Sequence, residues 1–111
     1  MTSRKNSDRF KVPPGVTDIV YGVIRDYRRR CEELTSSIVS EESKEMFYKL
    51  NGAVESALLL VEDGVRDVFI YDMSHKVGYY HSKAMDFMNH KSYHLRKRKL
   101  IYSIAKILSL V

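Results

Sequence analysis

Apolar residues recur at intervals of three and four positions along most of this chain, and this spacing constrains its fold most strongly. It is the period of one face of an α-helix, whereas a half-buried strand shows alternation of apolar and polar residues. Residues 65–77 contain a strand-like run, VFIY, but a lone strand would have no partner. We therefore predict an all-α fold of four to five helices, with a short helix at about 66–74.

The first predicted helix follows the turn sequence Pro13, Pro14, Gly15 and uses Thr17 as its N-cap. Arg25, Arg28 and Arg29 fall on its polar side. Its apolar face comprises Ile19, Val20, Val23, Ile24, Tyr27, Cys31, Leu34 and Ile38.

A second long helix is predicted to start after Ser40, a good N-cap, and to end near Gly64, a residue suited to a left-handed C-terminal position. Gly52 lies inside this helix, where it either permits a close helix crossing or marks a bend. The short loop near residues 35–40 requires the two long helices to pack antiparallel. The apolar face of the second helix comprises Met46, Phe47, Leu50, Ala53, Val54, Ala57, Leu58 and Val61.

A chain of 111 residues has room for one core, so we predict a flexible basic arm over residues 1–15 and a single helical domain over residues 16–111. The only cysteine, Cys31, excludes an intramolecular disulfide and a thiolate zinc cluster. The sequence has no signal-peptide pattern and no run of 18 apolar residues. These features predict a soluble, cytoplasmic protein with no membrane partner.

Charge is segregated along the chain. Residues 1–30 carry eight Lys and Arg against three Asp, and residues 91–111 carry six Lys and Arg with no acid. Residues 31–90 carry eleven Asp and Glu against five Lys and Arg. The basic ends indicate two positive surfaces, or one if the ends meet in the fold, and they favour an anionic partner. The alternative is that the acidic middle neutralises the ends internally.

The C-terminal segment has the order of a helix-turn-helix, at about residues 79–109. A short helix is predicted over 80–88, then a turn at 89–91, then a helix capped by Ser92 that runs to about residue 109. One face of the last helix is apolar and carries Tyr93, Lys97, Leu100, Ile101, Ile104, Ala105 and Leu108. The opposite side carries His94, Arg98, Lys99, Tyr102 and Lys106.

The segment GYYHSKAMDFMNHKSYHLRKRKLIYSIAKIL resembles the C-terminal part of the ArpU and RinA type transcriptional regulators of phages of Gram-positive bacteria, which are similar to region 4 of sigma factors. The resemblance covers roughly residues 66–109 and implies a transcriptional regulator that binds double-stranded DNA. Whether RNA polymerase is a further partner stays open. The predicted DNA-binding residues are Lys91, Ser92, Tyr93, His94, Arg96, Lys97, Arg98 and Lys99.

The remaining side chains do not assemble a catalytic set. His90 and His94 are four residues apart, but no recognisable motif supplies a third metal ligand, and there is no glycine-rich phosphate loop. We therefore predict no enzyme activity, no cofactor and no metal. A homodimer is expected, with the first helix as its interface, and the arm residues Arg4, Lys5, Arg9 and Lys11 are expected to add contacts to DNA.

Two other functions fit the sequence. The protein is alternatively a small interaction or inhibitor protein whose basic helix docks on an acidic partner. A further alternative is that the protein binds single-stranded nucleic acid or a packaging site. Aromatic rings stack on bases, and four tyrosines lie near the basic segment: Tyr79, Tyr80, Tyr93 and Tyr102.

Overall fold

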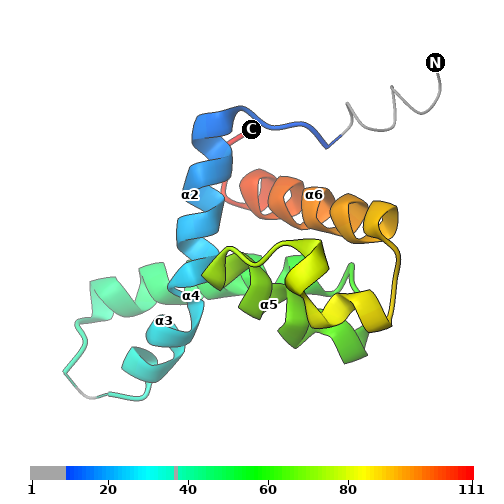
Figure 1. Cartoon of the computed structure of the whole chain (residues 1–111). Helices are drawn as coiled ribbons and strands as arrows, with labels where there is room; N and C mark the ends of the chain where they lie inside the picture. Colours follow the sequence, from blue (N-terminus) through cyan, green and yellow to red (C-terminus); the bar gives the residue numbers. More distant parts are fainter. Residues whose placement is uncertain (1–9, 37) are drawn as a thin grey trace.

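The computed structural model of the protein describes residues 10–36 and 38–111, and these residues form helices and no strand. The all-α prediction is therefore confirmed. The α-helices are α2 (Pro14–Arg25), α3 (Tyr27–Leu34), α4 (Glu41–Leu58), α5 (Arg66–His75) and α6 (His90–Ile107), and three short 3-10 helices are η1 (Asp63–Val65), η2 (Tyr79–His81) and η3 (Lys83–Asp86) (Figure 1).

The predicted first helix is two helices, and it begins earlier than expected. Pro14 occupies the first turn of α2, where its fixed φ suits a helix and its missing N–H costs nothing. Thr17 is therefore not the N-cap; its hydroxyl lies within α2, 3.4 Å from the carbonyl oxygen of Pro13. The helix breaks at Asp26, and Ile38 lies beyond α3 with 92% of its surface exposed. The prediction that Ile38 belongs to the helical core face is wrong.

A buried arginine ties α2, α3 and α4 together. Arg30 is 2% exposed, and its Nε donates to Asn51 Oδ1 at 2.6 Å. Its guanidinium also donates to the carbonyl oxygen of Val23, in the last turn of α2, where carbonyl groups lack helical partners. Burial lowers the pKa of Arg30 from its ordinary value. The sequence pattern assigned Arg25, Arg28 and Arg29 to the solvent, where all three are exposed, but it gave no sign of this role for Arg30.

Helix α4 starts as predicted, and the Ser40 hydroxyl accepts a hydrogen bond from the Ser43 N–H at 3.2 Å. It ends at Leu58, before Gly64, which lies in η1 and has no left-handed φ, so that prediction is wrong. A Cβ added at Gly52 would have no atom within 4 Å outside the backbone of its own helix, so this glycine permits no close crossing.

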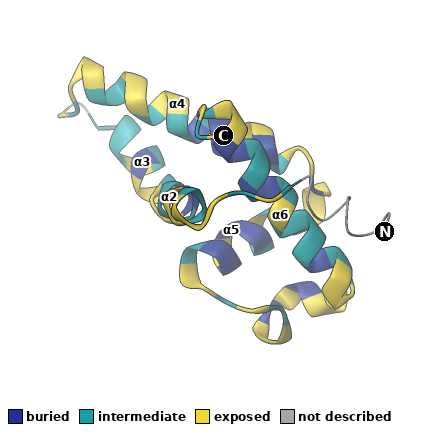
Figure 2. Cartoon of the chain, turned by 90° about the horizontal axis from the view of Figure 1, so that it is seen from above, coloured by how far each residue is buried: buried dark blue, intermediate teal, exposed yellow. Residues whose placement is uncertain are grey.

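Helices α3 and α4 form the antiparallel pair. Tyr27 donates to Glu55, and the amide of Asn51 reaches Cys31 at 3.5 Å, so residues later in α3 meet residues earlier in α4. Only this second half of the predicted first helix takes part in the pair. Figure 2 looks down the axis of α2 and along the side of α4, which shows how steeply α2 is inclined to α4.

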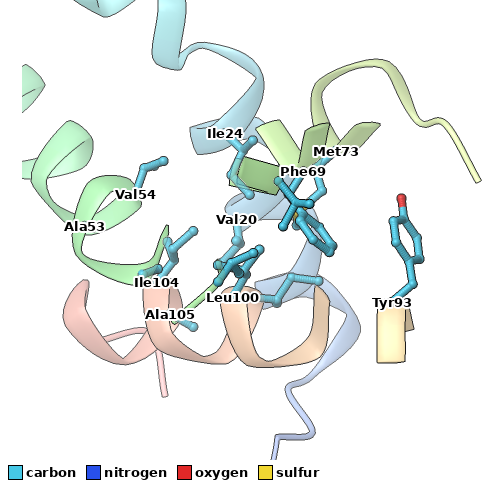
Figure 3. Close-up of a cluster of buried hydrophobic side chains, with 14 of the residues drawn as sticks. Val20, Ile24, Ala53, Val54, Phe69, Met73, Tyr93, Leu100, Ile104 and Ala105 are labelled. Carbon is cyan, nitrogen blue, oxygen red and sulfur yellow. The ribbon is translucent and has the colours of Figure 1, made fainter. Parts of the chain in front are cut away.

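The core lies where α2, α4, α5 and α6 meet, and Figure 3 shows the side chains that these helices contribute to it. Full burial of one large apolar side chain stabilises the fold by about 1.5–3 kcal/mol. The largest fully buried side chains are Val20 from α2, Val54 from α4, Phe69 and Met73 from α5, and Tyr93, Leu100 and Ile104 from α6.

Helix α5 confirms the prediction of a helix at about 66–74. It ends at His75, and the next residue, Lys76, has a left-handed φ of 55°. The predicted helix over 80–88 is wrong, because this segment forms η2 and η3 instead. Ser82 separates them with an extended backbone, and its hydroxyl accepts from the Ala84 N–H at 2.9 Å while donating to buried Asp72. The hydrogen bond to Asp72 holds Ser82 in an extended backbone conformation, which a continuous helix over this segment would not allow.

Candidate nucleic-acid interface

Helix α6 carries the C-terminal basic cluster, and its start differs from the prediction. Asn89 is the N-cap, with Oδ1 accepting from the Ser92 N–H at 2.8 Å, so Ser92 lies inside the first turn and is not the cap. The helix ends at Ile107 rather than near residue 109. Its predicted apolar face is buried at Leu100, Ile101, Ile104 and Ala105, which fixes the opposite side toward solvent.

Tyr93 does not lie at the surface. Its side chain is 0% exposed, its ring stacks on Phe69 with centroids 5.1 Å apart, and its hydroxyl donates to Asp72 Oδ2 at 2.7 Å. Burial raises its pKa. The prediction that Tyr93 contacts DNA is therefore wrong in this fold. The helical spacing of the sequence had already placed Tyr93 on the apolar face of this helix. That spacing predicts the burial of Tyr93 better than its basic neighbours predict contact with DNA.

Arg96 is held by an acid from outside α6. Its Nη2 lies 2.6 Å from Glu62 Oε1 and its Nε lies 3.1 Å from Oε2. The hydrogen bonds from Arg96 lower the pKa of Glu62 to about 2. Arg96 also donates to the carbonyl oxygen of Ser92 at 3.3 Å. Of the predicted site residues, Arg96 alone forms an ion pair with another residue in the described ranges.

Lys97 points away from the outer side of α6. It is half-buried, and its ammonium nitrogen lies over the Tyr93 ring, 5.2 Å from the centroid. Burial lowers its pKa. Lys97 lines a groove together with Tyr21 and Arg25 of α2, so it lies at a different surface from Arg98.

The outer side of α6 carries basic residues that no acid neutralises. Lys91, Arg98 and Lys106 are exposed, and Lys99 is half-buried beside them. Within residues 10–36 and 38–111, none of these four forms an ion pair, and α6 itself contains no acid. We call these four residues the cationic face: Lys91, Arg98, Lys99 and Lys106.

The N-terminal segment reaches the same side of α6 and joins the two basic ends of the chain. The Phe10 ring meets the Tyr102 ring edge-on at 5.7 Å, and the Lys99 ammonium lies 5.7 Å from the Phe10 centroid. Lys106 lies 5.8 Å from the Tyr102 centroid. In Figure 1 the blue segment before α2 passes along α6. The ends therefore meet, although Arg4, Lys5 and Arg9 lie outside the described residues.

Aromatic and imidazole rings gather at the start of α6. His94 Nε2 lies 3.1 Å from His90 Nε2, and Tyr80 stacks on His90 with centroids 5.5 Å apart. Partial burial, with the charges of His90, Lys97 and Arg98, lowers the pKa of His94. Among the described residues, no three His, Cys, Asp or Glu side chains are grouped as a metal would require.

Comparisons with protein-family models, with curated proteins and with solved structures find no match. No helix in the described ranges has both the length and the apolarity to cross a membrane.

Proposed function

We propose that the protein is a DNA-binding transcriptional regulator that reads duplex DNA with α6. The observation that carries this proposal is the cationic face, four basic residues on one side of a helix that contains no acid. None of the four forms an ion pair with another described residue. Cations that form no ion pair are free to replace the counterions of DNA phosphates, and this replacement supplies a large share of the affinity of such complexes.

The burial of α6 supports insertion into a groove. Its apolar face is anchored on the core through Leu100 and Ile104, so its outer side can approach DNA as a rigid unit. A B-DNA major groove, about 12 Å wide, admits one α-helix. Arg98 is the best candidate to reach a guanine edge, while Lys91, Lys99 and Lys106 are suited to phosphates.

In a helix-turn-helix of this kind, η2 and η3 take the position of the first helix. Asp72 accepts hydrogen bonds from Ser82, between these 3-10 helices, and from Tyr93 of α6. This buried network fixes the segment before α6 relative to α6 itself. Resemblance to the ArpU and RinA type regulators adds transcriptional regulation, with a phage or mobile element as the source, to the proposal.

We extend the proposal to a homodimer. A single recognition helix contacts few base pairs, and two half-sites multiply the affinity. Ile19 of α2 is 51% exposed and lies on the helix that the sequence favoured as the interface. Sedimentation at tens of micromolar is expected to show a dimer, and a monomer alone would contradict this extension.

Single-stranded nucleic acid is a second candidate, and a specific observation favours it. Tyr80 is 69% exposed and stacks on His90, which is exposed next to Lys91. Stacking of a base on an aromatic ring contributes about 1–3 kcal/mol and does not depend strongly on sequence. Tyr80→Ala should then weaken binding to a single strand more than binding to a duplex.

The test is a titration of labelled duplex DNA with the wild type and with the variant Lys91→Gln, Arg98→Gln, Lys106→Gln. These three side chains are exposed, so the variant should keep the helical circular dichroism spectrum while its affinity falls by about tenfold or more. Lys49→Gln, an exposed lysine of α4, is the control and should bind like the wild type. Unchanged affinity of the triple variant would overturn the proposal, and tighter binding to the matching single strand would favour the second candidate.

A further inference from the structure

A polar groove lies between α2, the end of α5 and α6, on a different side of α6 from the cationic face. Its volume is about 570 Å³, within the range of small-molecule sites. Its charged and hydroxyl-bearing lining consists of Asp18, Tyr21 and Arg25 from α2, Asp72 from α5, Lys76 after α5, and Lys97 from α6.

Three cations line this groove, together with the acids Asp18 and Asp72. Arg25, Lys76 and Lys97 form no ion pair within the described part of the chain, whereas Arg29, Lys44, Arg66 and Arg96 do. Like charges that share one depression repel each other unless an anion lies among them. The cations of the lining outnumber its acids by three to two, so the groove keeps a positive excess among the described residues.

The two acids of the groove leave this excess in place. Asp72 is 2% exposed, and its Oδ2 accepts hydrogen bonds from the hydroxyls of Ser82 and Tyr93. It therefore offers little surface to a ligand. Asp18 is exposed and forms no ion pair among the described residues. Burial lowers the pKa of Lys97 more than the charge of Asp72 raises it.

Lys76 and Lys97 are both held in ways that cost free energy. Lys76 adopts φ 55° and ψ 42°, a left-handed conformation that costs a non-glycine residue about 1–2 kcal/mol. The stem of Lys97 is half-buried against Tyr93, which partly desolvates its ammonium and lowers its pKa. A left-handed residue is common directly after a helix, so the conformation of Lys76 follows from the end of α5. A bound anion would offset both the desolvation and the repulsion.

We infer that the groove binds a phosphate group through Arg25, Lys76 and Lys97. The guanidinium of Arg25 suits two phosphate oxygens at once, and each ammonium adds a further charged hydrogen bond. The hydroxyl of Tyr21 lies in the same lining and can donate to the ligand. The phosphate belongs either to a phosphorylated small molecule or to a DNA backbone, and the inference does not rest on the proposed function.

The experiment titrates inorganic pyrophosphate into the full chain in the absence of DNA and follows binding by calorimetry. Saturable binding is expected for the wild type and should weaken about tenfold or more in Lys97→Met, which keeps the apolar stem on Tyr93, and in Arg25→Gln. Arg25 is exposed, so its variant should fold even if Lys97→Met does not. Lys49→Gln is the matched control. No binding at about 10 mM, or equal binding by all variants, would overturn the inference.

A second arm separates the groove from the cationic face and identifies the source of the phosphate. The triple variant of Lys91, Arg98 and Lys106 should bind pyrophosphate like the wild type, even if it no longer binds DNA. Competition between pyrophosphate and duplex DNA, with weaker DNA binding by Arg25→Gln, would assign the groove to a backbone phosphate; simultaneous binding would assign it to a small molecule. Loss of pyrophosphate binding in the triple variant alone would contradict the site.

Discussion

Arg96 and Glu62 form a bidentate ion pair that connects α6 to the segment after α4. The Arg96 Nη2 lies 2.6 Å from Glu62 Oε1, and the Arg96 Nε lies 3.1 Å from Glu62 Oε2. The pair withdraws one of the basic residues of α6 from any anionic partner. Both side chains are partly exposed, so the pair adds little to stability, about 1 kcal/mol at most. Its main effect is on the charge that α6 presents.

Glu62→Gln should increase the affinity for duplex DNA by roughly two- to fivefold, because a freed Arg96 can contact a phosphate. A fluorescence titration at low salt measures the change. Glu45→Gln is the control, since it removes the same charge from an exposed position of α4. An equal gain in both variants would attribute the effect to net charge and not to Arg96.

Tyr93→Phe should lower the free energy of unfolding by about 1–3 kcal/mol, because buried Asp72 loses one of its two hydroxyl donors. Urea denaturation measures this change. Tyr102→Phe is the control: its hydroxyl has no hydrogen bond within the described residues, so its effect should stay within about 0.5 kcal/mol. Equal stability of the two variants would contradict the role of the Tyr93 hydroxyl.

The helices could be predicted from sequence because their signals are local. The 3.6-residue period identified α4 and α6, and Ser40 marked the start of α4. Helix α5 was predicted because a lone strand over these residues would have no partner. The same period placed Tyr93 in the core, which is where it lies. The same period predicted one continuous first helix through Asp26, where the structure has a break between α2 and α3. Nothing in the local sequence pattern signals this break.

Other features depend on residues far apart in the chain, and sequence spacing does not show them. The 3-10 segment before α6 follows from the bond between Ser82 and Asp72, and the neutralisation of Arg96 follows from Glu62. The burial of Arg30 requires Asn51 from another helix. The groove is lined by Arg25 from α2, Lys76 after α5 and Lys97 from α6. These residues are far apart in the sequence, so no sequence motif predicts the groove.

Gly52→Ala should raise the free energy of unfolding by about 1 kcal/mol, since alanine has the higher helix propensity and the added Cβ meets no neighbouring side chain or helix. Thermal unfolding should shift upward by about 4 °C. Gly22→Ala in α2 has the same open surroundings and should behave alike. A lower midpoint for Gly52→Ala would mean that another surface packs on this glycine.

Stability should fall as the pH is lowered from neutral through 6.5. The pKa of His94 is lower in the folded chain than its ordinary value of 6.5, first because of burial and then because of His90, Lys97 and Arg98. The unfolded chain therefore binds more protons in this window, and the stabilisation by neutral His94 is present above pH 6.5 and lost below the folded pKa. His94→Gln should flatten the dependence of urea midpoints on pH, whereas His81→Gln should not. Identical slopes for His94→Gln and the wild type would contradict this.

The central claim is that α6 engages duplex DNA through the cationic face, and salt dependence tests it most directly. Affinity of the wild type and of the triple variant Lys91→Gln, Arg98→Gln, Lys106→Gln should be measured between about 50 and 200 mM salt, because each lost phosphate contact lowers the slope of log affinity against log salt by about 0.9. If all three residues contact phosphates, the slope should fall by about 2.7, and by less if Arg98 contacts a base. Equal slopes for the two proteins would contradict the claim and would leave an acidic protein as the better partner for α6.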